Sequence, residues 1–154
     1  MVMLTIRGLA LAAAFAFSGA AAEELDLNLD PTGAILNGYD PVAYFEHGTA
    51  VEGSRAISRR HRGADVRFSS EDHRTLFDGD PEAYFPQFGG YCAFGVRMGH
   101  KIPSDPKAWE IVDGRLFVFL DLGTEEVWRM APKDNIAIAD KVWPRLGADT
   151  ERQP

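Results

Sequence analysis

The chain has 154 residues, of which 45% are hydrophobic and 11% aromatic, so it can bury the core of one domain and is not disordered in composition. Its formal charge of −7 argues against a general nucleic-acid binder, because such proteins neutralise phosphates with Lys and Arg. The single basic run, Arg59-Arg60-His61-Arg62, is short. We interpret it as the solvated end of a strand, with His61 exposed.

Residues 1–22 have the pattern of a secretory signal peptide. Arg7 precedes the apolar run LALAAAFAFSGA, and three alanines precede Glu23. This run is shorter than the roughly 20 apolar residues that a membrane span needs. We therefore expect cleavage to leave Glu23–Pro154 as a single periplasmic or secreted domain without a membrane span.

Four Asp-Pro pairs divide the chain, and each can begin a turn or a short helix because Asp caps a helix and Pro fits its first position. They are Asp30-Pro31, Asp40-Pro41, Asp80-Pro81 and Asp105-Pro106. The first half then predicts the following elements in order: a short helix over 41–46 that ends at His47-Gly48, a hairpin of 54–61 and 66–68, a helix over 71–77 capped by Ser70, and a short helix over 81–85.

The second half predicts a helix in YCAFGVRM, after Gly89-Gly90, that closes at Gly99. AWEIV and RLFVFL flank Asp113-Gly114, which is a strong hairpin signal. One helix follows from Gly123-Thr124 through EEVWRM, and a last one runs over NIAIADKVW until Pro144 stops it. These elements indicate a small α+β domain with two antiparallel hairpins, which we expect to form one sheet, and several short helices.

Cys92 is the only cysteine, so no intrachain disulfide can form. In an oxidising compartment an unpaired cysteine indicates an intermolecular partner or a reactive thiol. Placed in the first turn of a helix, the thiol would be favoured as a thiolate, and Gly95 three residues later would let another element approach closely. The alternative is a small buried hydrophobe, as most free cysteines are.

Three further side chains are candidate metal ligands. His73 precedes Leu76 and Phe77 by three and four residues, so its imidazole should lie along the apolar face of its helix, either as a ligand or base or as a core-edge histidine bonded to a carbonyl. Met98 and His100 follow Cys92, and the three together would suit Cu(I) if their segment were not a regular helix. We expect His47 only to complement a helix dipole.

The segment NGYDPVAYF is rich in candidate polar groups. Asp40 is explained as a helix N-cap without further function, and packing explains Tyr39 and Tyr44 as well as a role in a site does. The sequence contains none of the motifs H-E-x-x-H, C-x-x-C or G-x-S-x-G. A four-ligand structural zinc site is disfavoured by the lone cysteine.

Three stretches resemble exported proteins with a YHS domain: NGYDPVAYF, GADVRFSSEDHRTLFDGDPEAYFPQFGGYCAFGV and DPKAWEIVDGRLFVF. The resemblance covers about Leu36 to Trp143 and implies a YHS-type domain over 23–154 with a role in metal handling. The chain departs from metal-binding relatives, which carry a cysteine pair: it has Phe68-Ser69-Ser70 and, in the next helix, His73. Some members of the exported subgroup that the chain resembles carry selenocysteine at the position matching Cys92, and this resemblance implies a functional thiol there.

These observations predict three alternative functions. The first is a periplasmic module that handles a soft metal, with copper the expected ion and with Cys92 and His73 as ligands. The second is a thiol oxidoreductase or peroxide-reducing enzyme in which Cys92 is the catalytic nucleophile and an external thiol or redox partner protein completes the cycle. The third is a non-enzymatic interaction domain with a structural Cys92.

Overall fold

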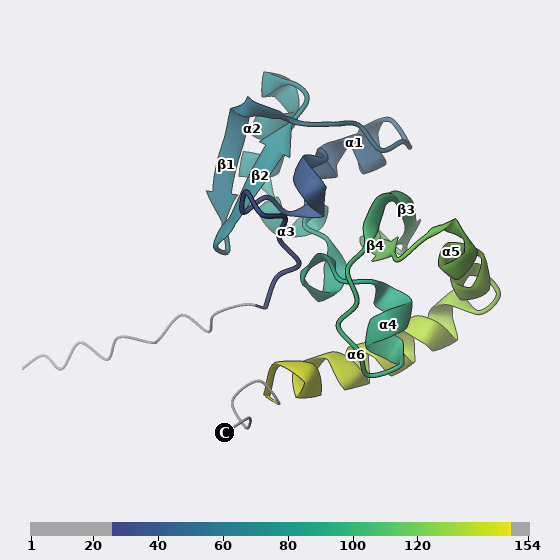
Figure 1. Cartoon of the computed structure of the whole chain (residues 1–154). Coiled ribbons are helices and arrows are strands. Elements are labelled where there is room, and N and C mark those ends of the chain that lie inside the picture. Colours follow the sequence, from purple (N-terminus) through teal and green to yellow (C-terminus); the bar gives the residue numbers. More distant parts are fainter. Residues whose placement is uncertain (1–25, 149–154) are drawn as a thin grey trace, which may run out of the picture.

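The computed structural model describes residues 26–148, which form an α+β domain with six α-helices, two short 3₁₀ helices and two hairpins (Figure 1). The predicted signal peptide lies outside the described residues. The elements are η1 Leu36–Gly38, α1 Pro41–Glu46, β1 Ser54–His61, β2 Ala64–Phe68, α2 Glu71–Gly79, α3 Pro81–Tyr84, η2 Gln87–Gly90, α4 Ala93–Arg97, β3 Asp105–Val112, β4 Arg115–Phe119, α5 Leu122–Arg129 and α6 Pro132–Ala148. The predicted fold class is confirmed.

The hairpins form two separate two-stranded sheets, so the expected single sheet is wrong. The reason lies at their inner edges. The edge of β2 is already paired, because Ala34 forms a parallel bridge with Asp65. The edge of β4 is occupied in the same way by Cys92, which bridges to Val118. In each hairpin, the strand edge that could have paired with the other hairpin therefore pairs with a nearby segment of irregular chain.

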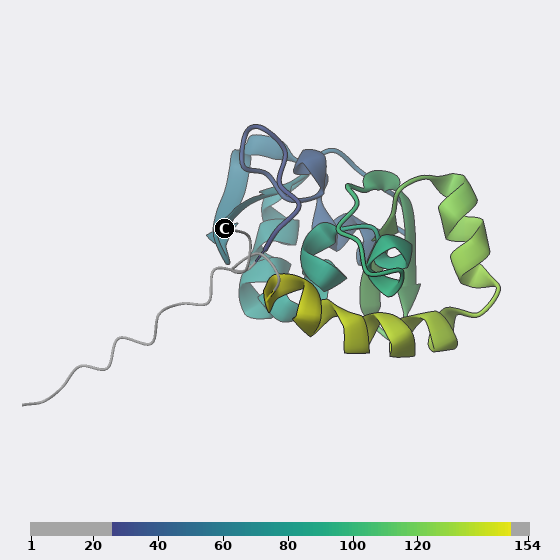
Figure 2. The same ribbon diagram turned by 60° about the horizontal axis from the view of Figure 1, so that its bottom comes forward.

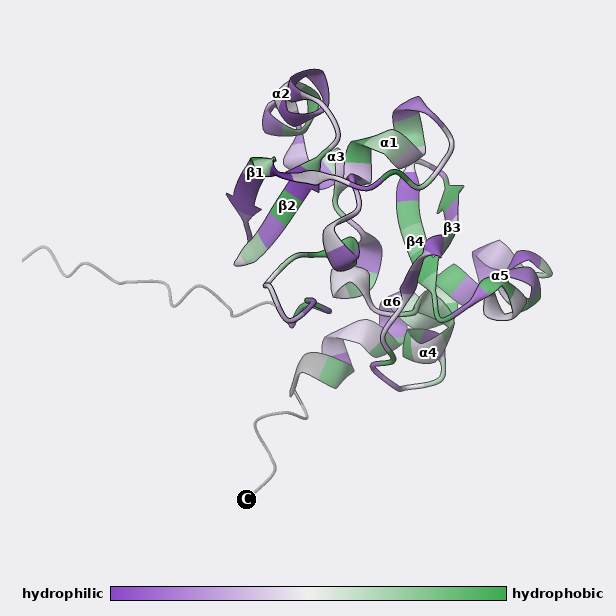
Figure 3. Cartoon of the chain, turned by 45° about the horizontal axis from the view of Figure 1, so that its top comes forward, coloured by the Kyte–Doolittle hydropathy of each residue, from purple (hydrophilic) through white to green (hydrophobic). Residues whose placement is uncertain are grey.

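The strand β4 separates two hydrophobic cores. Leu116 and Val118 pack into a first core with α1, α2 and the first hairpin, whereas Phe117 and Phe119 pack into a second core with α4, α5 and α6. Alternate residues of a strand point to opposite faces, so a strand buried on both faces reads as a continuous apolar run. This explains the sequence LFVF. By contrast β1 has no buried residue and is largely hydrophilic (Figure 3).

Local signals set most helix ends. Asp40 and Asp80 cap α1 and α3, and Ser70 caps α2, as expected. The Asp105-Pro106 pair is an exception: it begins β3 instead of a turn or helix. The β3–β4 register shifts between Asp105 and Trp109, so Pro106 lies in an irregular part of the ladder where a missing N–H is tolerated.

The last helix continues through Pro144, which was expected to stop it. Figure 2 shows α6 as a long helix that runs along one side of the molecule past α4. Trp143 and Leu146, on either side of the proline, both pack against the second core. This burial offsets the one backbone hydrogen bond that the proline removes.

Replacing Pro144 with Ala should therefore stabilise the protein. An interior proline costs about 3 kcal/mol relative to Ala, and its restriction of the unfolded chain returns about 0.4–1 kcal/mol. Because the site is near the end of α6, we expect the free energy of unfolding in urea to rise by about 1 kcal/mol or more. Pro132→Ala, at the first position of α6 where proline is compatible, is the control and should give no such gain. An unchanged or lower stability of Pro144→Ala would contradict a helix that continues to Ala148.

Candidate functional site

Asp40 is a fully buried carboxylate with a complete set of hydrogen-bond donors. Its Oδ1 caps α1 by accepting from the backbone N–H of Val42 at 2.9 Å. Its Oδ2 accepts from the backbone N–H of Ser69 at 2.8 Å, from the Ser69 hydroxyl at 2.7 Å and from Nδ1 of His73 at 2.6 Å. A buried charge is tolerated only when it is paired and hydrogen-bonded in this way.

The position of His73 follows from the helix that carries it. Ser70 caps α2 by accepting from the His73 backbone N–H at 3.1 Å, and the side chain, 8% exposed, turns inward one turn before Phe77. The expectation of an inward-facing imidazole is confirmed. Because Asp40 Oδ2 acts as the acceptor, Nδ1 of His73 carries the proton. In the neutral imidazole Nε2 then keeps its lone pair, and this is the tautomer that binds a metal through Nε2.

His47 lies beside His73. It is the exposed C-cap residue of α1, and the centroids of the two imidazole rings are 4.9 Å apart with their planes at 33°. From the sequence, His47 is expected only to complement the helix dipole, so its place beside His73 was missed. We refer to Asp40, His73 and His47 as the histidine cluster.

Ser69 completes a set of residue types found in hydrolases, but its geometry is different. Its hydroxyl lies on the Nδ1 side of His73, at 3.3 Å, and donates to Asp40. A nucleophilic serine must instead contact Nε2, the nitrogen that the carboxylate leaves free. Ser69 therefore helps to hold Asp40 and is not an activated nucleophile.

Cys92 lies in the second core and is 1% exposed. It is the N-cap of α4, where its Sγ accepts from the Gly95 backbone N–H at 3.4 Å. The close approach that Gly95 permits is made by Ile102, whose carbonyl also accepts from the Cys92 backbone N–H at 2.8 Å. The space beside the thiol is thus filled by the protein itself.

The other proposed ligands do not join Cys92. Met98 is 56% exposed at the end of α4 and His100 is exposed after it, whereas Cys92 is buried and His73 belongs to the histidine cluster beside the first core. Within residues 26–148, no three His, Cys, Asp or Glu side chains are grouped so as to hold a metal ion. Copper binding through Cys92 remains a prediction to which this geometry adds no second ligand.

His61 is half-buried, so the expectation that it is exposed is wrong. Its ring packs edge-on against Phe77 at 5.5 Å and Phe85 at 5.2 Å, and its Nε2 lies 3.0 Å from a Glu82 carboxylate oxygen. Strand alternation turns this residue inward while its arginine neighbours face solvent.

The two tyrosines of NGYDPVAYF have structural contacts. Tyr44 donates to the carbonyl of Pro106 at 2.8 Å and packs on Trp109, and its burial raises the pKa of the phenol above its usual range. Tyr39 is half-buried, and its hydroxyl lies 3.5 Å from a Glu52 oxygen. Neither tyrosine contacts the histidine cluster through a hydrogen bond of the described residues.

The second role of Asp40 was also missed by sequence reasoning. An N-cap uses only one carboxylate oxygen, and the capping motif gives no information about the other. A signal was nevertheless available. Asp40 is a charged residue in a segment that is otherwise rich in apolar residues, and His73 was expected to face inward from its own helix. Their separation of 33 positions hid it, because contact over that distance depends on how α1 and α2 pack.

No protein-family profile, curated protein or solved structure matches the chain. The resemblance to YHS domains therefore stays a prediction. Within residues 26–148, no helix is both long enough and apolar enough to cross a membrane.

The burial of Cys92 predicts a slow thiol. In the native protein, modification by an aromatic disulfide reagent should be at least about a hundredfold slower than in guanidinium chloride, because the reagent must wait for local opening of α4. Equal rates in the two conditions would mean that the thiol is accessible, and would restore the thiol-based functions as the leading hypotheses.

Asp40→Asn should destabilise the fold by about 2–4 kcal/mol. The amide NH₂ would face groups that are themselves donors, either at Ser69 and His73 or at Val42. Asp80→Asn is the matched control: Asp80 is also an N-cap before a proline, but it is exposed. Since Asn caps as well as Asp does, that variant should lose no more than about 0.5 kcal/mol in urea unfolding. Similar losses for both variants would show that Asp40 is merely a cap.

Proposed function

We propose that the protein is an exported metal-binding module in which His73 and His47 hold a copper ion and Asp40 orients His73. The observation that carries the proposal is the 2.6 Å hydrogen bond from Nδ1 of His73 to a fully buried carboxylate beside a second imidazole. Metal-binding histidines typically donate their other N–H to a carboxylate, which fixes the tautomer and makes the free nitrogen a better ligand.

The spacing of the two rings fits a shared ion. Two imidazoles bound at about 2.0–2.1 Å to one ion at a tetrahedral angle have ring centroids roughly 5 Å apart, close to the 4.9 Å between His47 and His73. Imidazole suits copper and zinc, and Cu²⁺ lies highest in the general order of affinities. Two protein ligands leave coordination positions for solvent or for a ligand from a partner, as a module that passes its ion on would need.

This proposal keeps the metal function expected from the sequence and moves its centre. His73 stays a ligand and His47 takes the place of Cys92 as the other ligand. Met98 and His100 have no part in the proposed site. Cys92 then has the structural role of the third alternative, as an N-cap and core residue of α4. An attacking thiolate receives no support from a side chain that is 1% exposed.

Calorimetric titration of the purified protein with Cu²⁺, against a competing chelator, tests the proposal. We expect one ion per chain, with the affinity falling about 10–100-fold or more when either His47 or His73 is replaced by Ala. His100→Ala is the matched control, because it removes another exposed imidazole, and Cys92→Ser removes the thiol. Both should bind copper as the parent does.

Two results would contradict the proposal. Binding that survives both His47→Ala and His73→Ala would place the ion elsewhere. Binding that is lost only in Cys92→Ser, with the variant folded by circular dichroism, would return the site to the thiol. Parallel titration with Zn²⁺ distinguishes a copper preference from general imidazole affinity.

A further inference from the structure

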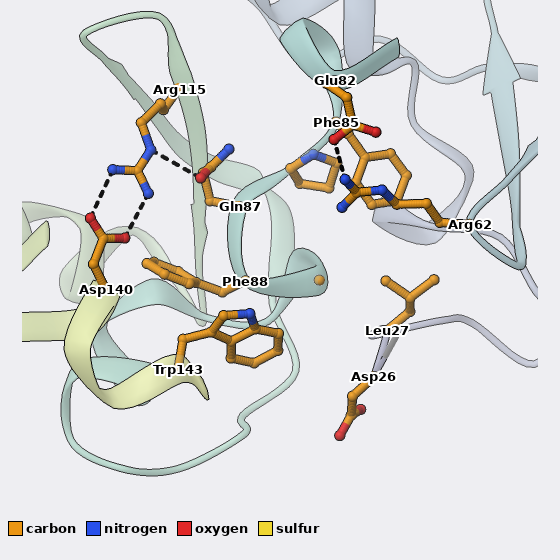
Figure 4. Close-up of a pocket in the computed structure, with 12 residues that line it drawn as sticks. Asp26, Leu27, Arg62, Glu82, Phe85, Gln87, Phe88, Arg115, Asp140 and Trp143 are labelled. Carbon is orange, nitrogen blue, oxygen red and sulfur yellow. Dashed lines mark hydrogen bonds and ion pairs between the residues drawn. The ribbon is translucent and has the colours of Figure 1, made fainter. Parts of the chain in front are cut away.

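A cavity of about 310 Å³ lies between α6, the segment that follows α3 and the turn that joins β1 to β2 (Figure 4). Its walls come from segments far apart in the sequence, with Arg62 on one side and Asp140 on the other. None of its lining residues belongs to the histidine cluster. Its volume is at the lower end of the range for small-molecule sites, which is about 300–1,000 Å³.

Aromatic rings line this cavity. Phe88 and Trp143 lie beside each other with ring centroids 5.8 Å apart, and Phe85 lies across the cavity next to Arg62 (Figure 4). Phe88 has a φ of 53°, in the left-handed region that a bulky residue rarely adopts. A strained backbone conformation of this kind persists only where the surrounding packing holds it in place. Such residues are concentrated at ligand-binding and active sites.

The charged groups of the cavity are held in ion pairs, and Asp26 is paired with Lys101, which does not itself line the cavity. Arg115 makes two parallel hydrogen bonds to Asp140, at 3.0 and 2.7 Å, and Arg62 is paired with Glu82. A guanidinium has five N–H donors and a carboxylate about four acceptor positions, so each pair keeps both unused donors and unused acceptors.

Gln87 lies between the two pairs. Its Oε1 accepts from Nε of Arg115 at 2.9 Å, while its Nε2 makes no hydrogen bond within the part of the chain that the structure describes. The side chain is held at one end and offers an amide donor at the other.

We propose that this cavity binds a neutral sugar, of the size of a monosaccharide or a disaccharide. The C–H face of a pyranose ring is weakly positive and stacks on the negative face of an aromatic ring, a role for the partly buried Trp143. Each sugar hydroxyl both donates and accepts, which matches planar guanidinium, carboxylate and amide groups held side by side. Because the cavity's arginines are already neutralised, it lacks the uncompensated charge that would select an ion. The proposal is independent of the metal site.

Nuclear magnetic resonance of the three tryptophan indole N–H groups tests this in the whole protein. Trp143 lines the cavity, whereas Trp109 and Trp128 do not, so they serve as internal references. The probes are glucose, galactose, mannose, N-acetylglucosamine, maltose and cellobiose, with benzoate as an anionic aromatic competitor. Trp143→Phe assigns the signal. We expect at least one sugar to shift the Trp143 indole signal in a saturable way and to leave the other two in place.

Arg62→Gln should weaken that sugar's binding by about tenfold, the effect of removing one or two hydrogen bonds to a ligand. Arg59→Gln is the matched control: Arg59 is an exposed arginine of the same hairpin, but it pairs with Asp78 and does not line the cavity. It should bind the sugar as the parent does. No saturable shift with any of the sugars, an equal effect of the two arginine variants, or tighter binding of benzoate would overturn the proposal.

Discussion

The arrangement of this molecule depends on β4 being buried on both faces. Because Leu116 and Val118 enter one core while Phe117 and Phe119 enter the other, the strand divides the interior into two compartments. Cys92 pairs with β4 and packs into the second compartment; His73 belongs to α2, which packs against the first. The two residues that the sequence singled out are therefore assigned to different environments, one apolar and closed, the other polar and partly open.

The polar environment is organised by Asp40. A buried carboxylate is costly unless its lone pairs are used, and here two backbone N–H groups, a hydroxyl and an imidazole use them. The same set of bonds ties the start of α1 to the end of β2 and to α2. A structural requirement and a chemical consequence coincide, because holding Asp40 in place also orients the ring of His73 through the contact with its Nδ1.

The features that the sequence predicted correctly are those encoded within a few residues. Asp40 and Ser70 cap their helices, and Asp113-Gly114 turns a hairpin with positive φ at both residues, because each signal acts on its own backbone. The predictions that were wrong concern features that depend on packing between segments far apart in the sequence. Cys92 pairs with the edge of β4, so the two hairpins do not join into one sheet. The burial of residues on either side of Pro144 lets α6 continue through the proline. His47 contacts His73 only because α1 packs on α2. Of the candidate site, sequence reasoning found His73 but neither of its partners.

The proposed metal site requires that Asp40 leave Nε2 of His73 free to bind a metal beside His47. Long-range ¹H–¹⁵N correlation of the four histidine side chains tests it most directly, first without metal near neutral pH and then with one equivalent of diamagnetic Zn²⁺. We expect a proton on Nδ1 of His73 and none on Nε2, and we expect the Nε2 signal to shift with zinc together with a nitrogen of His47 while His100 is unchanged. A proton on Nε2 of His73, or a zinc response confined to other histidines, would contradict it.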